Sequence, residues 1–160
     1  MNIWLSEEWR SNKALVDFHK EGLRCYFDSR CSFEVKKSCK RFSRWLRNNF
    51  HFPVKVLISF MAYDSIEATD GDYVSALFVE PFMGPEYPHI YIAVGDYDVQ
   101  KKEAGQDNAL GGILRSVAHE LTHYYQWLNG IKLTETGYEL QARYYADVIV
   151  GWYSTSYEHP

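Results

Sequence analysis

An α+β fold in a single domain is the architecture that this 160-residue sequence predicts. Apolar residues recur at helical spacing in both halves of the chain, whereas short β-rich segments separated by turns occupy the middle. Helical and strand segments are thus segregated, as is typical of α+β domains. A composition that is 46% hydrophobic suffices for one core. We expect N-terminal helices on a small, twisted, mixed sheet, followed by two further helices, with no prediction of strand order.

The N-terminal part of the chain is predicted to be helical. One helix is expected within Ser6–Phe27 and a second over Phe33–Asn49, where the Ser32 side chain can serve as the N-cap. The second helix has Lys and Arg on one face. Its opposite face carries a stripe that is expected to be buried: Val35, Cys39, Phe42 and Leu46.

The middle of the chain supplies the sheet. A first strand is predicted over Val54–Phe60, and the turn sequence Thr69–Asp72 precedes a second strand over Tyr73–Val79. Glu80–Pro88 contains three prolines and a glycine, which predicts a loop. His89–Val94 is expected to be a third, short strand.

A long helix is predicted next. Asp107 is taken as its N-cap and Gly130 as the residue just beyond its C-terminus, and Lys101–Gln106 is expected to be a polar connector that leads into it. Its aliphatic stripe consists of Leu110, Leu114, Val117, Leu121 and Leu128.

The sequence His119–His123 (HELTH) places two imidazoles one turn apart on this helix. Residues i and i+4 share a helix face, so both rings can reach one metal ion. Glu120, rotated by about 100° from the first His, can hold the water on that metal. The two His lie opposite the aliphatic stripe and share their face with small or polar residues, namely Gly112, Ser116 and Gln126. This position favours metal binding over burial.

A catalytic zinc site usually has three protein ligands and one open position. A third His six residues after His123 is excluded, because Asn129 stands there. The remaining candidates are downstream carboxylates: Glu139, Glu135 and, more remotely, Asp147.

Geometry favours Glu139 among the three. A second helix, capped by Thr134 or Thr136, is predicted to run to about Tyr153. Two helices joined by a short loop pack antiparallel, which brings Glu139 opposite the His pair. Glu135 lies on the same face at the start of that helix and stays an alternative. Small side chains on this face allow a close approach of the two helices: Ala142 and Ala146, followed by Val150.

The motif HELTHYYQ followed by ELQA resembles the gluzincin pattern, in which HExxH is followed by ExxA on the next helix. The chain is similar in length to the minigluzincins and to metallopeptidase domains of the ImmA/IrrE type. The resemblance covers about a third of the chain. It implies a minimal zincin-like fold in which His119, His123 and Glu139 bind one catalytic Zn²⁺ and Glu120 is the general base.

One departure from the family pattern concerns the support of the His ligands. Larger gluzincins often carry an Asp four residues after the ligand Glu, where it steadies a zinc-bound His, but Arg143 stands at that position. Asp147, one turn further, is the available substitute. By the same resemblance, the sheet edge beside the metal helix binds extended substrate, and either Tyr73–Val79 or His89–Val94 is expected to form it.

The predicted function is that of a zinc-dependent endopeptidase acting on protein or peptide substrates. The alternative is a regulatory or peptide-binding module with little turnover, or a latent peptidase whose tail, Ser154–Pro160, occupies the cleft through Glu158 and His159. The oxyanion-stabilising residue is not assigned. Its candidates are Tyr138, Tyr145, Tyr153, Tyr157, His51, His89 and His159, whereas His19 is expected to be a solvated helix residue.

Charge argues against a nucleic-acid partner. The first 50 residues contain 11 Lys and Arg against six Asp and Glu, whereas the other 110 contain six against 15, for a net charge of −4. The basic surplus falls mainly on Lys36–Arg47 and is interpreted as a solvated helix face, because the chain is acidic overall and lacks a nucleic-acid-reading motif.

The expected location is the cytoplasm. No apolar run approaches 18 residues, so no membrane span is predicted, and the N-terminus lacks the pattern of a signal peptide. Cys25, Cys31 and Cys39 match no metal-ligand spacing and are expected to be free thiols in a reducing compartment. A Cys25–Cys31 disulfide is the less favoured possibility.

Overall fold

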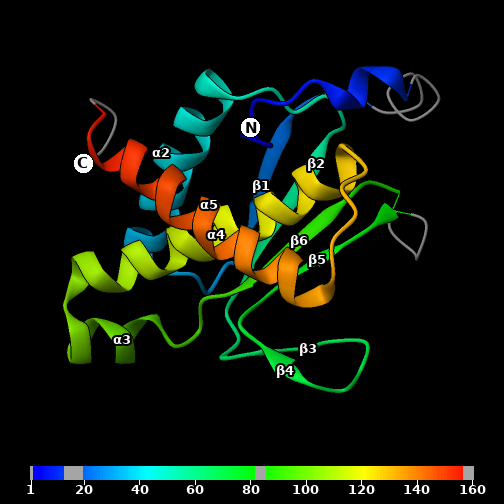
Figure 1. The fold of residues 1–160 in the computed structure, drawn as a ribbon. Helices are drawn as coiled ribbons and strands as arrows, with labels where there is room; N and C mark the ends of the chain where they lie inside the picture. The colour runs from blue at the N-terminus through cyan, green and yellow to red at the C-terminus, as the bar shows by residue number, and fades with distance from the viewer. Residues whose placement is uncertain (1, 13–19, 82–85, 157–160) are drawn as a thin grey trace.

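The computed structural model describes residues 2–12, 20–81 and 86–156, and it confirms the α+β class (Figure 1). The predictions for His19, for the loop around residues 82–85 and for the tail beyond residue 156 lie outside these residues. The described helices are a 3₁₀ helix η1 (Glu8–Ser11) and α2 (Phe33–Asn49), α3 (Tyr97–Ala104), α4 (Gln106–Leu128) and α5 (Glu135–Ser154). The described strands are β1 (Leu23–Phe27), β2 (Val56–Met61), β3 (Ile66–Glu67), β4 (Tyr73–Val74), β5 (Ala76–Val79) and β6 (His89–Ala93).

Four strands form the main sheet in the order β1-β2-β6-β5. β1, β2 and β6 are parallel, and β5 runs antiparallel to β6 at the edge, so the sheet is mixed as predicted. Strands β3 and β4 form a separate antiparallel ribbon. The predicted strand Tyr73–Val79 is therefore split at Ser75 into β4 and β5, which belong to different sheets.

Helices cover one face of the main sheet. Burial alternates along β2, and Val56, Ile58 and Phe60 point into the core because successive side chains point to opposite faces. α2 packs beside β1 while α4 packs beside β5 and β6, and α5 packs mainly on α4 (Figure 1). The sheet and α2 thus hold α4 in place, and α5 lies against α4.

The α2 prediction is confirmed. The helix spans Phe33–Asn49, the Ser32 side chain accepts a hydrogen bond from the Val35 amide at 3.2 Å, and the predicted stripe is buried. The three cysteines are free. The prediction of free thiols is therefore confirmed, and the less favoured possibility of a Cys25–Cys31 disulfide is wrong.

Two elements differ from the predictions. Leu23–Phe27, expected to end a helix, is strand β1, because its backbone pairs in parallel with β2, a segment more than 30 positions further along the chain. Lys101–Gln106, expected to be a connector, instead contains the last turn of α3 and the first residue of α4. Lys101 forms an ion pair with Glu34 at 2.8 Å, and Tyr97 is buried, so tertiary contacts with α2 hold this short helix.

The N-terminal segment packs against α4. The indole nitrogen of Trp4 donates to the Thr122 hydroxyl at 3.0 Å, and the Asn129 side chain accepts a hydrogen bond from the Trp9 amide at 3.1 Å. Asn129, the residue that excludes a third His ligand, therefore links the end of α4 to η1.

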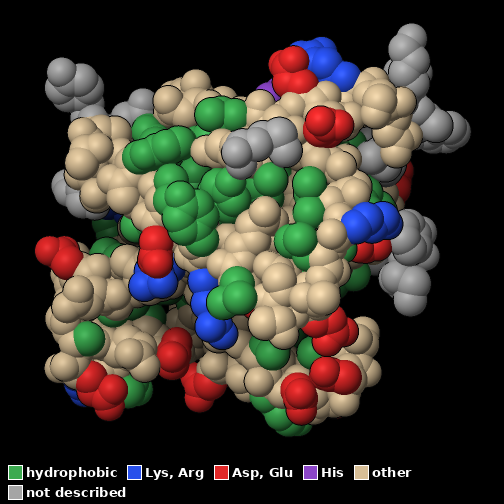
Figure 2. Space-filling model, in the orientation of Figure 1, with side chains coloured by type: hydrophobic (Ala, Val, Ile, Leu, Met, Phe, Trp, Pro, Cys, Tyr) green, Lys and Arg blue, Asp and Glu red, His purple; other side chains and the backbone are tan. Residues whose placement is uncertain are grey.

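The outer face of α5 exposes large hydrophobic side chains. Leu140, Tyr144 and Trp152 are exposed, and Figure 2 shows hydrophobic side chains gathered over this helix. Within the described parts of the chain, every helix is too short or too polar to cross a bilayer.

Candidate metal centre

α4 is a 23-residue helix that begins at Gln106, one residue before the predicted cap. Its N-cap is Gly105 rather than Asp107. It ends at Leu128, and Gly130 has φ +63°, the left-handed conformation that glycine adopts just beyond a helix C-terminus. Its predicted stripe lies in or against the core, which directs the opposite face, with the two His, away from the sheet core.

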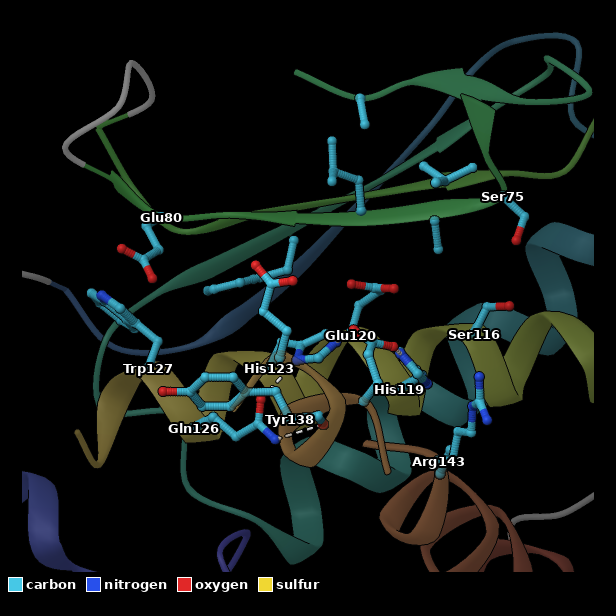
Figure 3. Close-up of a pocket in the computed structure, with 18 of the residues that line it drawn as sticks. Ser75, Glu80, Ser116, His119, Glu120, His123, Gln126, Trp127, Tyr138 and Arg143 are labelled. Carbon is cyan, nitrogen blue, oxygen red and sulfur yellow. Dashed lines mark hydrogen bonds and ion pairs between the residues drawn. The ribbon is translucent and has the colours of Figure 1, made fainter. Parts of the chain in front are cut away.

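The structure brings the predicted ligand atoms of both helices together (Figure 3). The Nε2 atom of His119 lies 3.1 Å from one Glu139 carboxylate oxygen, and Nε2 of His123 lies 3.1 Å from the other. One ligand atom from each of the three side chains lies within 4.8 Å of the other two. Two imidazoles and one carboxylate form a donor set that suits zinc and leaves a position for a further ligand. Among the described residues this is the one such group of His, Cys, Asp and Glu.

Two residues just after the HExxH motif fix α4 to the rest of the fold. The Tyr124 hydroxyl donates to the Val54 carbonyl at 2.6 Å, and the Tyr125 hydroxyl donates to the His51 carbonyl at 2.7 Å. Both rings are almost completely buried. The chain entering β2 is thereby tied to the helix that carries the His pair, which limits rotation of that helix about its axis.

Gln126 supports His123, a role that the sequence analysis missed. Its side-chain oxygen lies 2.7 Å from Nδ1 of His123. Its amide nitrogen donates to the Tyr138 carbonyl at 3.0 Å and to the Gln141 side-chain oxygen at 2.9 Å. Gln126 is 3% exposed, so its own side chain is largely shielded from water, and the three hydrogen bonds are partly buried. The available signal was its position three residues after His123, on the same helix face.

These contacts determine the tautomer of His123. The Tyr138 carbonyl can only accept, so the Gln126 amide nitrogen must face α5 and its oxygen must face the imidazole. In its neutral form, His123 then carries its proton on Nδ1 and presents the lone pair of Nε2 to the Glu139 oxygen at 3.1 Å. Two acceptor atoms at this distance repel each other unless a proton or a metal cation lies between them.

Burial shifts the pKa values of the two α4 residues that begin the motif. The pKa of His119 is lowered, first by burial and then by His123, which favours the neutral imidazole that metals bind. Burial and, secondarily, the Glu139 charge raise the pKa of Glu120 to about 8. Glu120 is 7% exposed, yet its side chain lines the same cleft as the His pair (Figure 3). It is thus poised to exchange a proton near neutral pH.

α5 begins as predicted. The Thr134 side chain caps it by accepting from the Gly137 amide at 3.1 Å, and the helix runs to Ser154. Ala142 and Ala146 are fully buried, or nearly so, where α5 packs on α4. Glu135, the alternative ligand, lines the cleft but does not belong to the group of ligand atoms.

Asp147 does not support either His. Its carboxylate forms an ion pair with Arg115 of α4 at 2.8 Å. Asp147, the less favoured substitute for the Asp of larger gluzincins, therefore does not take that role, and the side chain that contacts His123 is Gln126.

A cleft of about 1310 Å³ lies over the three ligand atoms, between β5 on one side and α4 and α5 on the other (Figure 3). β5 is an edge strand, whereas β6 is paired on both sides. Of the two segments that were considered for a substrate-binding edge, only Tyr73–Val79 therefore has a strand edge available for pairing. Residues on both sides of Ser75 line the cleft.

The candidates for an oxyanion-stabilising residue are mostly occupied elsewhere. Tyr138 lines the cleft, but its hydroxyl donates to the Ile131 carbonyl at 2.8 Å. His51 pairs with Glu21, and His89 bonds to Ser59 on the sheet. Tyr145 and Tyr153 are buried in the core. Tyr157, Glu158 and His159 lie outside the described residues, so the latent-tail alternative is not described by the structure.

Comparison of the chain with protein-family models, with curated proteins and with solved structures found no significant match. The resemblance to gluzincins therefore rests on the two motifs and on the geometry of their side chains.

Proposed function

We propose that this protein is a zinc-dependent endopeptidase of the gluzincin type. His119, His123 and Glu139 would hold one Zn²⁺, and Glu120 would act as the general base. The substrates would be proteins or peptides that lie along the cleft beside β5. The free cysteines favour a reducing compartment such as the cytoplasm.

One observation carries the proposal: the contact between His123 and Glu139. The Gln126 amide directs the Nε2 lone pair of His123 at a Glu139 oxygen 3.1 Å away. Helix caps, the buried Ala142 and the Gln126 hydrogen bonds hold these two acceptors in place. A cation bound by both atoms would remove the repulsion, and the neighbouring Nε2 of His119 would be a third donor for it. A metal ion would use all three side chains as ligands and would also account for the position of Glu120 beside them.

The arrangement of the protein groups suits peptide hydrolysis. Zinc in such a site supplies a Lewis acid that polarises a carbonyl and acidifies water. Glu120 takes the proton from the attacking water and delivers it to the leaving amine, a role that needs a pKa near the working pH. Its raised pKa, about 8, gives the carboxylate a strong affinity for that proton. A site that only binds peptide has no use for a carboxylate buried beside the metal ligands.

The experiment that tests this proposal measures the cleavage of a mixed peptide library by three samples: zinc-loaded wild type, the same protein after chelation, and zinc-loaded Glu120→Gln. We expect cleavage by the first sample alone, with a loss of about 10²-fold or more in Glu120→Gln, because general-base catalysis contributes that much. Zinc content of Glu120→Gln should equal that of the wild type, which separates catalysis from binding.

Equal cleavage by wild type and Glu120→Gln would contradict the mechanism. Stoichiometric zinc without any cleavage, together with peptide binding, would instead identify a peptide-binding module.

A further inference from the structure

The cleft is chemically asymmetric about the three ligand residues. α4 and α5 are antiparallel, so the residues one turn before His119 and one turn after Glu139 lie at the same end of the cleft. The ion pair between Arg115 and Asp147 at 2.8 Å confirms this alignment. Trp127, one turn after His123, lies at the opposite end (Figure 3).

The first end carries an available cation. Arg143 lies one turn beyond Glu139, about 6 Å along the helix axis, and lines the cleft. Figure 3 shows it on the His119 side of the site, near Ser116. Arg115 at this end is neutralised by Asp147, but no described Asp or Glu forms an ion pair with Arg143.

Small side chains leave room beside this cation. Gly112 and Ser116 line the cleft on α4, and Ala146 lines it on α5. Ser75 faces them from the strand side (Figure 3). A substrate side chain or chain end can therefore reach the guanidinium without displacing a large residue. Guanidinium binds carboxylate through paired, charge-assisted hydrogen bonds.

The second end is aromatic. Trp127 lines the cleft next to Phe78 of β5, with ring centroids 6.4 Å apart, and Ile131 is adjacent. The charged residues at this end are Glu80, Glu135 and Lys132, two acidic and one basic. A carboxylate therefore gains more at the Arg143 end than at the Trp127 end.

We propose that Arg143 is a specificity residue that binds a carboxylate of the substrate, about one helical turn from the metal ligands. This inference deepens the proposed function, because it defines the substrate class as peptides that carry an acidic side chain or a free C-terminus at that position. The carboxylate lies on the His119 side of the reacting bond.

The test measures binding separately from catalysis. Dye-labelled ten-residue peptides would be titrated against zinc-loaded Glu120→Gln protein. For each internal position, one pair of peptides would carry either Glu or Gln at that position and be otherwise identical. A further pair would have either a free or an amidated C-terminus. We expect that in one of these pairs the peptide with the carboxylate binds about three- to tenfold more tightly than its uncharged counterpart. The pair that responds identifies the source of the carboxylate.

Reversal of the charge at position 143 should reverse the preference for the peptide that carries the carboxylate. In the Glu120→Gln background, Arg143→Lys should retain the preference for carboxylate, and Arg143→Glu should reverse it, so that the uncharged member of the responding pair binds more tightly. Arg44→Glu is the matched control, because Arg44 is an exposed residue of α2 that does not line the cleft. The control makes the same change in net charge and should leave the preference intact. Zinc content is measured in each variant.

Equal binding of both members of every pair would overturn this inference, as would an Arg143→Glu protein that keeps the acidic preference. A uniform loss of cleavage of all peptides by an otherwise wild-type protein carrying Arg143→Lys would also overturn it, since that result indicates stabilisation of the transition state. If wild-type protein fails to cleave but binds with the Arg143-dependent preference, the proposed function fails and this inference stands.

Discussion

The orientation of one side-chain amide, that of Gln126, governs how His123 faces Glu139. Gln126 contacts both helices of the site, since it bonds to His123 on its own helix and to Tyr138 and Gln141 on α5. It therefore sets the tautomer of neutral His123 and the position of the helix that brings Glu139.

We predict that Gln126→Ala weakens zinc binding by about 10- to 100-fold, as loss of an outer hydrogen bond to a His ligand does elsewhere. Competition with a chromophoric chelator measures the dissociation constant. Gln141→Ala is the matched control, because it removes only one of the two acceptors of the same amide, and its effect should be smaller. Zinc affinity that is equal in wild type and Gln126→Ala would show that His123 needs no support.

Glu120 makes the stability of the metal-free protein depend on pH. Its pKa is raised from 4.5 in the unfolded chain to about 8 in the fold, so the folded state binds the proton more tightly. The stabilisation by this protonated carboxyl is complete below about pH 4.5 and is lost as pH rises to about 8.

Urea denaturation of chelated protein at pH 5 and pH 8 tests this effect. Glu120→Gln, which stays neutral, should lose less stability between these two pH values than the wild type. Zinc should reduce the pH dependence of the wild type, because a nearby cation favours the ionised carboxylate. Identical pH dependence in both chelated proteins would contradict the buried, high-pKa state.

Some of the site residues were predictable from the sequence and others were not. The positions of His119, Glu120 and His123 follow from helical periodicity alone, so their common face was predictable. The role of Gln126 was not, because its partners Tyr138 and Gln141 depend on how α5 docks on α4. The role of Arg143 was likewise hidden, since only the assembled cleft shows which side of the metal ligands it occupies.

At the scale of elements, the contact between α4 and α5 places Glu139. Ala142 and Ala146 are 0% and 2% exposed, so the two helices approach closely at these positions. Helices with larger side chains at the contact lie further apart. The site therefore depends on small side chains that carry no metal-binding chemistry of their own.

We predict that Ala142→Leu separates the helices, lowers the free energy of unfolding by about 1–3 kcal/mol and weakens zinc binding, since overpacking a full contact forces the backbone apart. Chemical denaturation and chelator competition measure the two effects. Leu140→Ala is the control on the same helix: Leu140 is 57% exposed, so both quantities should change little. An Ala142→Leu protein with unchanged zinc affinity would show that the helix spacing does not position Glu139.

Long amphipathic helices were predictable and short elements were not. α2, α4 and α5 were placed within one or two residues, because periodic burial and the caps at Ser32 and Thr134 mark them locally. β1 and α3 were missed because their stability comes from remote partners: β1 pairs with β2, and α3 is tied to Glu34 of α2. Five-residue strands and eight-residue helices have too little periodicity to be recognised alone.

At the scale of the whole molecule, the sheet and helices serve to bring three separate features to one cleft. The His pair comes from α4, the carboxylate from α5 and the free strand edge from β5. The class of fold was predictable from the segregation of helices and strands, but the order β1-β2-β6-β5 was not, and neither was the cleft that this order creates. Strand order depends on pairings between distant segments that no local pattern specifies.

If the proposed site binds zinc, the ion should also stabilise the whole fold. A ligand that binds only the folded state adds about 2.7 kcal/mol at a concentration 100 times its dissociation constant. Added Zn²⁺ should therefore raise the unfolding temperature of the wild type in a concentration-dependent manner. Mg²⁺ serves as the control, because it prefers oxygen ligands and should have little effect. A wild type that Zn²⁺ leaves unchanged would contradict a preformed metal site.

The central claim is that His119, His123 and Glu139 together hold one zinc ion, and elemental analysis of purified protein tests it most directly. Wild type, Glu139→Ala and Glu135→Ala would be compared, with circular dichroism to show that each is folded. The account predicts about one zinc per chain in the wild type and in Glu135→Ala, and a large loss in Glu139→Ala. Zinc retained in Glu139→Ala but lost in Glu135→Ala, or absent from all three folded proteins, would contradict it.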